Sequence, residues 1–247
     1  MSAFLTYENW NNDKVASVIK QFGDYLDVIK WAFREYGDNI VYACSFGAES
    51  VVLIDLISKV KKDAKIVFID TSFHFKETYE LIEKVKRRYP GLQIERVEPQ
   101  LTPEAQALRY GDELWKKNPD LCCYLRKVVP LKKALEPYPA WISGLRREQS
   151  PFRKNIRYIN KDDKFRKIKV CPLIHWSRED IQMYTEINNL PCHSLVIRGY
   201  PSVGCAPCTK PVKENENARS GRWAGTGKTE CGELELELVA QSMLCRL

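Results

Sequence analysis

Ile40-Val41-Tyr42-Ala43-Cys44-Ser45-Phe46-Gly47-Ala48-Glu49-Ser50 is the stretch of sequence that decides the fold. Its first part, Ile40–Ser45, predicts a buried β-strand, a loop of small residues follows, and a helical pattern then runs to about Val60. Strands that alternate with helices of this length form βαβ units. We therefore predict a doubly wound, mostly parallel α/β sheet whose ligands bind at the carboxyl ends of the strands. The next elements are expected as strands at Lys65–Asp70 and Leu92–Val97, with a helix at about Lys76–Tyr89 between them.

The flanking regions add helices and end in a segment without regular periodicity. Apolar residues at helical spacing predict a helix over Asn12–Tyr36, and Gly37 is a natural place for it to end. Periodicity fades after Pro191, and a polar, glycine-containing run then predicts a mobile tail. We therefore divide the chain into an α/β domain at 1–212 and a flexible C-terminal tail at 213–247. Further elements are expected as helices at Pro103–Lys117, Cys122–Leu135 and Ser177–Leu190 and as a short strand at Trp141–Leu145.

Composition indicates a globular protein with a basic surface. The chain has 247 residues, of which 44% are hydrophobic and 29% charged, so it can bury a core. The net charge of +7 suits an anionic ligand, although such a charge is also common on a solvated surface. No apolar stretch reaches the ~20 residues that span a bilayer, and the N-terminus lacks a secretion signal pattern, so we expect a cytoplasmic protein with no membrane partner. Thiols stay reduced in that compartment, so the nine cysteines need a role other than disulfides.

Three polar loops follow predicted strands and are expected to meet at one edge of the sheet. The loop at Ser45–Ser50 opens a helix, whose positive end favours an anion, and it lacks the Gly-Lys-Ser/Thr of a Walker loop. Asp70 and Thr71 end the second strand, where they either face the same crevice or cap the following turn. Arg146 and Arg147 follow a later strand, and they either bind a sulfate or phosphate group or form a surface charge pair.

Four cysteines in two close pairs give the sharpest signal. Cys122 and Cys123 are adjacent, and Cys205 and Cys208 form a C-x-x-C pair. Four thiolates of this kind can hold a [4Fe–4S] cluster or a tetrahedral zinc ion, and directly adjacent cysteines favour the cluster. The alternative is that the adjacent pair are small core residues. Three other cysteines are expected in the core and two histidines in structural positions: Cys44, Cys171, Cys192, His175 and His193.

A lone cysteine, Cys231, lies between Glu230 and Gly232 after the polar run. A flexible, glycine-flanked segment is a poor place for a core residue, and the preceding Lys228 brings the positive charge that lowers a thiol pKa from ~8.5. Cys231 is therefore the candidate nucleophile. Glu230 and Glu233 oppose a thiolate, so the cations that stabilise it must come from the surface on which the segment docks.

Together these segments resemble the assimilatory adenylyl-sulfate and phosphoadenylyl-sulfate reductase family. They occur in the family's order, and they cover the chain from about residue 40 to residue 232. The double cysteine, the C-x-x-C pair and the later Glu-Cys-Gly form a highly specific combination. The matching segments are Ser45–Glu49, Ile69–Thr71, Cys122–Lys127, Ser143–Ser150, Gly199–Thr209, Gly221–Trp223 and Glu230–Gly232.

The resemblance implies an adenine nucleotide α-hydrolase-like fold and an enzyme of sulfate assimilation and cysteine biosynthesis. The Cys231 thiolate would attack the sulfur of adenylyl sulfate (APS) and expel AMP, and thioredoxin or glutaredoxin would then release sulfite from the S-sulfocysteine. A [4Fe–4S] cluster on the four cysteines would shape the charge near the substrate, with Lys127 between cluster and sulfate. A homo-oligomer would fit the family. The implied substrate-binding residues are Arg146, Arg219 and Arg222 for phosphate and sulfate, and Ser45, Gly47, Asp70 and Thr71 for the nucleotide.

Several alternatives stay open. Family members with the cluster cysteines usually use APS, but some also accept its 3′-phosphorylated form (PAPS), so PAPS reduction is the alternative reaction. The family usually has an aliphatic residue and then His after Cys-Gly, whereas Glu233 and Leu234 stand here and are expected to slow the attack. An ATP-pyrophosphatase or tRNA-thiolation enzyme would show Ser-Gly-Gly-x-Asp-Ser in place of Ser45–Ser50. A zinc-stabilised nucleic-acid-binding module would need a basic stripe, but the basic residues are evenly spread, so we expect no nucleic-acid partner.

Overall fold

One sheet organises the chain in a computed structural model that describes residues 4–213, 215–226, 228 and 230. In this part of the chain six strands lie in the order β3-β2-β1-β4-β6-β5. Neighbouring strands are parallel except β5, which pairs antiparallel with β6 at one edge. The strand order reverses at β1, which confirms the predicted doubly wound, mostly parallel fold. The strands are β1 (Ile40–Cys44), β2 (Lys65–Ile69), β3 (Gln93–Val97), β4 (Ala140–Ile142), β5 (Ile159–Asp162) and β6 (Lys167–Val170).

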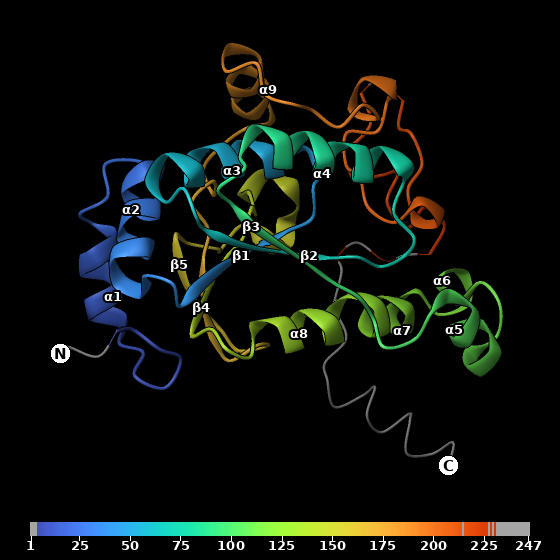
Figure 1. Cartoon of the computed structure of the whole chain (residues 1–247), viewed down its shortest axis with the longest axis horizontal. Coiled ribbons are helices and arrows are strands. Elements are labelled where there is room, and N and C mark those ends of the chain that lie inside the picture. The colour runs from blue at the N-terminus through green and yellow to red at the C-terminus, as the bar shows by residue number, and fades with distance from the viewer. Residues whose placement is uncertain (1–3, 214, 227, 229, 231–247) are drawn as a thin grey trace.

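Helices cover both faces of the sheet. α2, α3 and α4 pack on one face, and α8 lies on the opposite face (Figure 1). Among the described residues, no helix combines the length and the apolar character needed to cross a membrane. The helices are α1 (Asn12–Ile19), α2 (Tyr25–Tyr36), α3 (Ala48–Val60), α4 (Lys76–Arg88), α5 (Pro103–Tyr110), α6 (Leu114–Lys117), α7 (Pro119–Cys123), α8 (Val129–Leu135) and α9 (Arg178–Ile187), and a π-helical turn (Tyr124–Val128) joins α7 to α8.

Successive side chains of β1 point to opposite faces of the sheet and pack in two different hydrophobic cores. Tyr42 and Cys44 belong to the larger core, which includes residues of α2, α3 and α4. Val41 points the other way and packs with Trp141 of β4 and Leu135 of α8. Because both faces of the central strand are buried, β1 is apolar along its whole length, as strands of parallel sheets usually are. The carboxyl ends of the strands are then the edge of the sheet where polar groups can gather.

The long N-terminal helix predicted from the sequence is divided in two. The prediction of one helix over Asn12–Tyr36 is wrong, because Asp24 starts a new helix there. Its carboxylate accepts hydrogen bonds from the Leu26 and Asp27 amides at 2.7 and 3.1 Å, which caps α2. The end of α2 is as predicted: Gly37 follows it with a φ of 56°, a conformation that glycine adopts without strain.

Short elements account for the other differences. The helix predicted over Pro103–Lys117 is interrupted at Gly111, which has a φ of 83°. The strand predicted at Trp141–Leu145 begins and ends earlier, as β4. β5 and β6 were not predicted, because each has only four residues: β5 has one apolar residue, Ile159, and in β6 lysines alternate with apolar side chains. They complete the sheet through tertiary contacts, including a hydrogen bond of 3.2 Å from the Trp141 indole to Asp162 of β5.

Candidate active site

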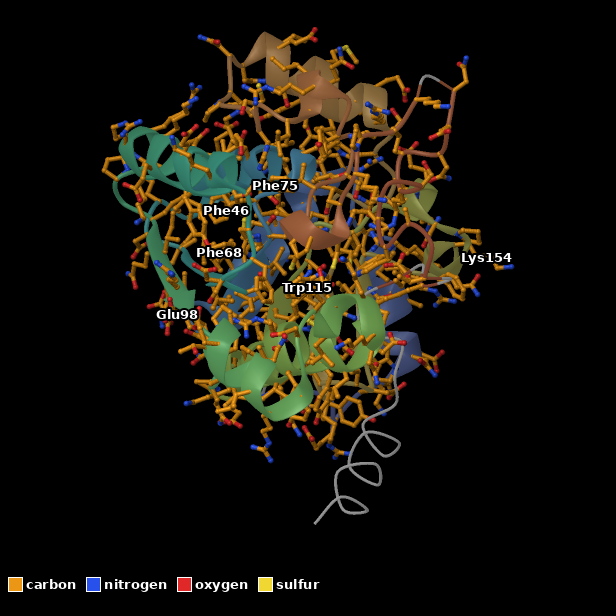
Figure 2. All side chains as sticks on the ribbon, turned by 90° about the vertical axis from the view of Figure 1, so that its right-hand side faces the viewer. Phe46, Phe68, Phe75, Glu98, Trp115 and Lys154 are labelled. Carbon is orange, nitrogen blue, oxygen red and sulfur yellow. The ribbon has the colours of Figure 1, made fainter. Side chains whose placement is uncertain are left out.

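The loop between β1 and α3 presents backbone amides at the carboxyl end of the sheet. Phe46 turns the chain in a left-handed conformation, with a φ of 51°, and its buried ring packs edge-to-face against Phe68 at 5.3 Å between centroids (Figure 2). Gly47 then starts α3 without a side-chain cap, so the first amides of the helix are available to a ligand. Ser45 is exposed beside it. Ser45 and Gly47 thus lie where the sequence predicts an anion-binding loop, and their binding role stays a prediction.

A cleft of about 590 Å³ lies beside this loop and is bordered by α3 and α9. Its lining includes Gly47, Glu49, Arg146 and Arg219. Arg146 is buried, its Nη2 lies 2.9 Å from a Glu49 oxygen, and it also pairs with Glu148. Burial opposes the charge of Arg146, but the two carboxylates prevail and hold its pKa above the ordinary value. The cleft therefore contains a cation that is already balanced by acidic side chains.

Asp70 and Thr71, predicted to bind the nucleotide, are both buried and both make contacts within the protein. Asp70 accepts a hydrogen bond from the Tyr79 hydroxyl at 2.9 Å, and its other oxygen lies 2.7 Å from Arg96 Nε. The Thr71 hydroxyl lies 3.2 Å from the sulfur of Cys205. These contacts fix the end of β2 and one of the predicted cluster cysteines. A direct role in nucleotide binding stays a prediction.

Four cysteines from two distant parts of the chain line one cavity. α7 supplies Cys122 and Cys123, and a later segment supplies Cys205 and Cys208. Cys205 reaches the edge of the sheet because its backbone pairs antiparallel with His74, just beyond β2. The structure therefore brings together the four residues predicted as metal ligands. The rest of the lining is mostly aromatic or cationic: Phe73, Trp115 (labelled in Figure 2), Pro119, Arg126, Lys127 and Trp223.

The sulfur atoms of this cavity influence one another. Burial, together with the charges of Cys205 and Cys208, raises the pKa of the Cys122 thiol to about 11. Among the described residues, no three Cys, His, Asp or Glu side chains converge as the ligands of one metal ion do. The four thiols instead surround a space. That arrangement fits the ligand set of an iron–sulfur cluster, whose irons each take one cysteine.

Arg126 offers this cavity a buried hydrogen-bond donor. Its side chain is 1% exposed, its Nε donates to the Thr71 carbonyl at 2.6 Å, and the guanidinium lies 4.6 Å from the centre of the Phe73 ring. Its Nη2 is buried and has no hydrogen-bond partner among the residues that the structure describes. Burying a charged hydrogen-bond donor without a partner reduces the stability of the folded protein. An anionic group with acceptor sulfurs in the cavity would satisfy Arg126, which is a second reason that the residues present fit a cluster.

Lys127 lines the same cavity as the cysteines, and its predicted place between a cluster and the sulfate stays a prediction. Burial, followed by the charge of Lys127, lowers the pKa of His74 to about 4, so the His74 imidazole is neutral at pH 7. We did not predict a role for His74 from the sequence. Its place directly after the polar loop at Asp70–Phe73 is the signal that could have indicated it.

Arg222 and Trp223 attach the following segment to the cysteine loop. The Trp223 amide donates to the Cys208 carbonyl at 2.9 Å, and the backbones of Thr209 and Arg222 pair antiparallel. The Arg222 guanidinium lies 4.5 Å from the centre of the Trp223 ring. It also lies against Gly204, where an added Cβ would overlap it. A larger residue at this position would have to displace the end of the Arg222 side chain. The predicted role of Arg222 in binding phosphate or sulfate stays a prediction.

Two ion-paired residues hold the described part of the C-terminal segment. Lys228 pairs with Asp120, three residues before the second cysteine of α7, and its side chain is 2% exposed. Glu230 pairs with Arg153 at 2.7 Å and with Arg219 at 3.1 Å. The carboxylate that was expected to oppose a thiolate is thus neutralised by cations of the docking surface.

The predicted nucleophile, Cys231, lies outside the described residues. Its role stays a prediction, as does the division of the chain into a domain at 1–212 and a flexible tail at 213–247. Among the described residues after 213, Arg222 and Trp223 make backbone contacts with Thr209 and Cys208 of the domain.

Comparison with known proteins identifies the family. The profile of the phosphoadenosine phosphosulfate reductase domain matches residues 39–211, which include the four cysteines of the cavity. The chain belongs to this family. An adenosine 5′-phosphosulfate reductase of Halalkalibacterium halodurans is 62% identical over 209 residues, 85% of this chain and 90% of that protein. Adenosine 5′-phosphosulfate reductase 2 of Bacillus subtilis is 56% identical over 232 residues, 94% of this chain and 98% of that protein.

Solved structures agree with this assignment. The phosphoadenylyl-sulfate reductase of Candida auris, in a phosphate complex, has a TM-score of 0.71 and 29% identity, covering 83% of this chain and 98% of its own. An FMN adenylyltransferase of Candida glabrata has a TM-score of 0.54 at 17% identity, covering 94% of this chain and 87% of its own, and it shows a likeness of fold alone. These neighbours confirm the adenine nucleotide α-hydrolase-like fold expected for the phosphoadenosine phosphosulfate reductase family.

Residues outside the predicted site are mostly where the sequence places them. Cys44 and Cys171 are buried, as predicted. The prediction for Cys192 is wrong: it is exposed and lines the cleft, because it follows the turn that leaves α9. His193 is buried and structural, with Nε2 3.0 Å from the Thr78 hydroxyl. His175 is exposed, and its ring lies 5.2 Å from that of Tyr158.

Sequence reasoning missed the partners of the predicted site residues. Glu49 and Arg126 belong to segments that match the family, so their place in the site could have been anticipated. Arg153 and Asp120 gave no such signal, because their ion pairs join parts of the chain that are far apart in sequence.

Proposed function

We propose that this member of the phosphoadenosine phosphosulfate reductase family reduces adenylyl sulfate to sulfite and AMP with electrons from thioredoxin, in assimilatory sulfate reduction. Relatives named adenosine 5′-phosphosulfate reductase are 56% to 62% identical to it over most of their length. The observation that carries the proposal is the single cavity lined by Cys122, Cys123, Cys205 and Cys208, next to a cleft with arginines. Reduction of PAPS is the alternative, since the family contains PAPS reductases.

The four cysteines would hold a [4Fe–4S] cluster, and Arg126 Nη2 would donate to its sulfur atoms. When bound, this group would supply negative charge that orients Lys127 and tunes the electrostatics of the site, without carrying electrons. The Thr71 hydroxyl and the Gln106 amide, which lie 3.2 Å from Cys205 and 3.8 Å from Cys122, would stabilise the ligand thiolates.

The nucleotide would bind in the cleft with its anionic groups toward the N-terminus of α3. Gly47 and the amides after it face an anion there without competition from a side-chain cap. Arg146 and Arg219 line the same cleft and would take up phosphate and sulfate oxygens. Because Arg146 is already paired with Glu49 and Glu148, the substrate would share or displace these carboxylates. Such exchange suits a ligand that enters and leaves in every turnover.

The first chemical step would be attack of the Cys231 thiolate on the sulfate sulfur. A sulfur–sulfur bond forms, the bond between that sulfur and the bridging phosphate oxygen breaks, and AMP leaves with the electron pair. An anion attacks an anion in this step, so cations near the sulfate lower the barrier. Arg219, Arg222 and Lys127 are the candidates for this task.

The second step would use a dithiol protein, thioredoxin or glutaredoxin, as the electron donor. One donor thiolate attacks the Cys231 sulfur and expels sulfite, which leaves a mixed disulfide. The second donor thiol then attacks that disulfide, restores the Cys231 thiol and leaves the donor oxidised by two electrons. Access of a protein partner to Cys231 requires the C-terminal segment to leave the cleft between the two steps.

Mass spectrometry of the Cys231 peptide tests this proposal. The iron-loaded protein is mixed with APS in the absence of any thiol, and a mass increase of one SO₃ group on that peptide is the expected result. A parallel reaction with PAPS decides between the two nucleotides. Cys231→Ser should bind AMP and retain its iron but form no sulfite. An unmodified Cys231 in protein with its full iron content would reject Cys231 as the nucleophile.

A further inference from the structure

The carboxylate of Glu230 sits in a site formed by three side chains. Arg153 donates to both of its oxygens, from Nε at 2.9 Å and from Nη2 at 2.7 Å. The Ser150 hydroxyl donates at 2.6 Å, and Arg219 Nη2 donates at 3.1 Å. The side chains of Glu230 and Arg153 are only 15% and 12% exposed. A paired, forked arrangement of this kind is strong and fixes orientation as well as distance.

The two arginines of this site differ in their relation to the cleft. Arg219 is part of the cleft lining, whereas Arg153 is not among the lining residues of the described chain. Arg153 ends the short helical turn Pro151–Arg153, and it also donates to Gln149, which in turn donates to Glu49 of the cleft at 2.8 Å. Arg153 therefore binds Glu230 outside the cleft lining, next to Arg219, a cation that the proposed substrate also needs.

The contact between Glu230 and Arg153 matters because Glu230 directly precedes Cys231 in the sequence. A contact that fixes Glu230 therefore limits the positions that Cys231 can take. Lys228 is fixed on the other side, by its ion pair with Asp120. The chain that leads to Cys231 is thus held at two points, one beside α7 with its cysteines and one at the edge of the cleft.

We infer that Glu230 is a positioning residue, whose carboxylate binds Arg153 and so holds the start of the Cys231 segment at the cleft. The inference rests on the proposed function, in which Cys231 is the nucleophile. Glu230 would not touch the reacting atoms. It would raise the rate of attack by reducing the number of positions that the thiolate can occupy, and its release from Arg153 would free the segment for the electron donor.

The same contacts allow an opposite idea, in which the carboxylate blocks the cleft by neutralising Arg219. The two ideas predict opposite changes. If Glu230 positions Cys231, its removal slows S-sulfonation and leaves nucleotide affinity nearly unchanged. If Glu230 blocks the cleft, its removal strengthens AMP binding and speeds S-sulfonation. Arg153 separates the ideas further, because it binds Glu230 but does not line the cleft.

The experiment compares the iron-loaded, full-length protein with Glu230→Gln, Arg153→Gln and the double variant. Glu216→Gln is the matched control, because Glu216 is an exposed carboxylate of the same segment that bonds only to Lys213 and Ser220 in the described contacts. Three quantities are measured for each: the rate of S-sulfonation of Cys231 by APS without thiol, the affinity for AMP, and the rate at which trypsin cleaves after Lys228. The last needs no activity and reports directly on release of the segment.

We expect both single variants to slow S-sulfonation by about 10- to 100-fold, with AMP affinity within about threefold of the wild type. Both should be cleaved faster by trypsin, and the double variant should be no worse than the worse single variant, because the residues act as a pair. Glu216→Gln should match the wild type. Unchanged S-sulfonation and cleavage in Glu230→Gln, or faster S-sulfonation with tighter AMP binding, would overturn the inference. If the wild type itself forms no S-sulfocysteine, the proposed function fails, while the cleavage rates still decide whether Glu230 holds the segment.

Discussion

The cleft and the cysteine cavity meet where the Arg219 guanidinium of the cleft lies 5.8 Å from the centre of the Trp223 ring of the cavity, but they balance their cations in different ways. In the cleft, Arg146 is paired with Glu49 and Glu148, and Arg219 is paired with Glu230. In the cavity, Arg126 is buried, and one of its donor atoms has no partner in the described part of the chain. The cations of the cleft are therefore already balanced within the protein, whereas an anionic group in the cavity would satisfy a buried donor.

This difference indicates which kind of ligand each region suits. Glu49 and Glu148 compete with a ligand for Arg146, which weakens the binding of that ligand and eases its release, as a substrate and a product require. An unsatisfied guanidinium next to four thiols favours a group that binds once and stays. The three predictions below test these two roles, in order of decreasing expected effect.

Removal of a cavity thiol should have the largest effect. Cys205→Ser takes away one of four predicted ligands and the partner of the Thr71 hydroxyl, so we expect the iron content to fall at least about tenfold. Iron and sulfide analysis of the purified variant measures this. Cys171→Ser is the matched control, since Cys171 is also buried but is not among the described residues that line the cavity. Full iron in Cys205→Ser, or loss of iron in Cys171→Ser, would contradict a cluster at these cysteines.

Separation of the Arg146 pair should have an intermediate effect. Arg146→Met leaves Glu49 partly buried without its cation, which should lower the free energy of unfolding by about 2 kcal/mol. The double variant Glu49→Gln, Arg146→Met should regain a large part of that loss, because no unpaired carboxylate remains. Urea denaturation measures the stability, and calorimetry with AMP should show weaker binding in both variants. A double variant as unstable as the single one would show that Arg146 is not balanced by Glu49.

The fold was largely predictable because it depends on local patterns. The segment Ile40–Cys44 and the strands that follow it along the chain are rich in apolar residues, as strands of a parallel sheet are, and this pattern identified the central strands. The break at Asp24 and the short strands β5 and β6 were missed, because they depend on one capping carboxylate and on contacts with distant residues. Periodicity holds no information on such contacts.

The candidate site was predictable to the extent that its residues stand in distinctive combinations. The cysteine pairs were found because adjacency and a C-x-x-C spacing are unusual, and the structure brings them into one cavity. The pairing of the charged residues could not be predicted, since 76 residues lie between Arg153 and Glu230 in the sequence and only the folded structure brings the two together. The sequence showed that Glu230 needed cations, but it could not say which arginines supply them.

Titration of His193 should give the smallest effect, and it tests whether the cleft tolerates an added charge. His193 lines the cleft, and burial lowers its pKa in the folded protein. The unfolded chain therefore binds a proton below pH ~6.5 that the folded protein resists, so His193 destabilises the fold as the pH falls through that value. His193→Gln can keep a hydrogen bond to Thr78 and cannot be protonated, so its melting temperature should fall less between pH 7 and pH 5 than that of the wild type. His175→Gln should change this dependence less, because His175 is exposed. An equal effect of both variants would mean that burial in the wall of the cleft is not what excludes the proton.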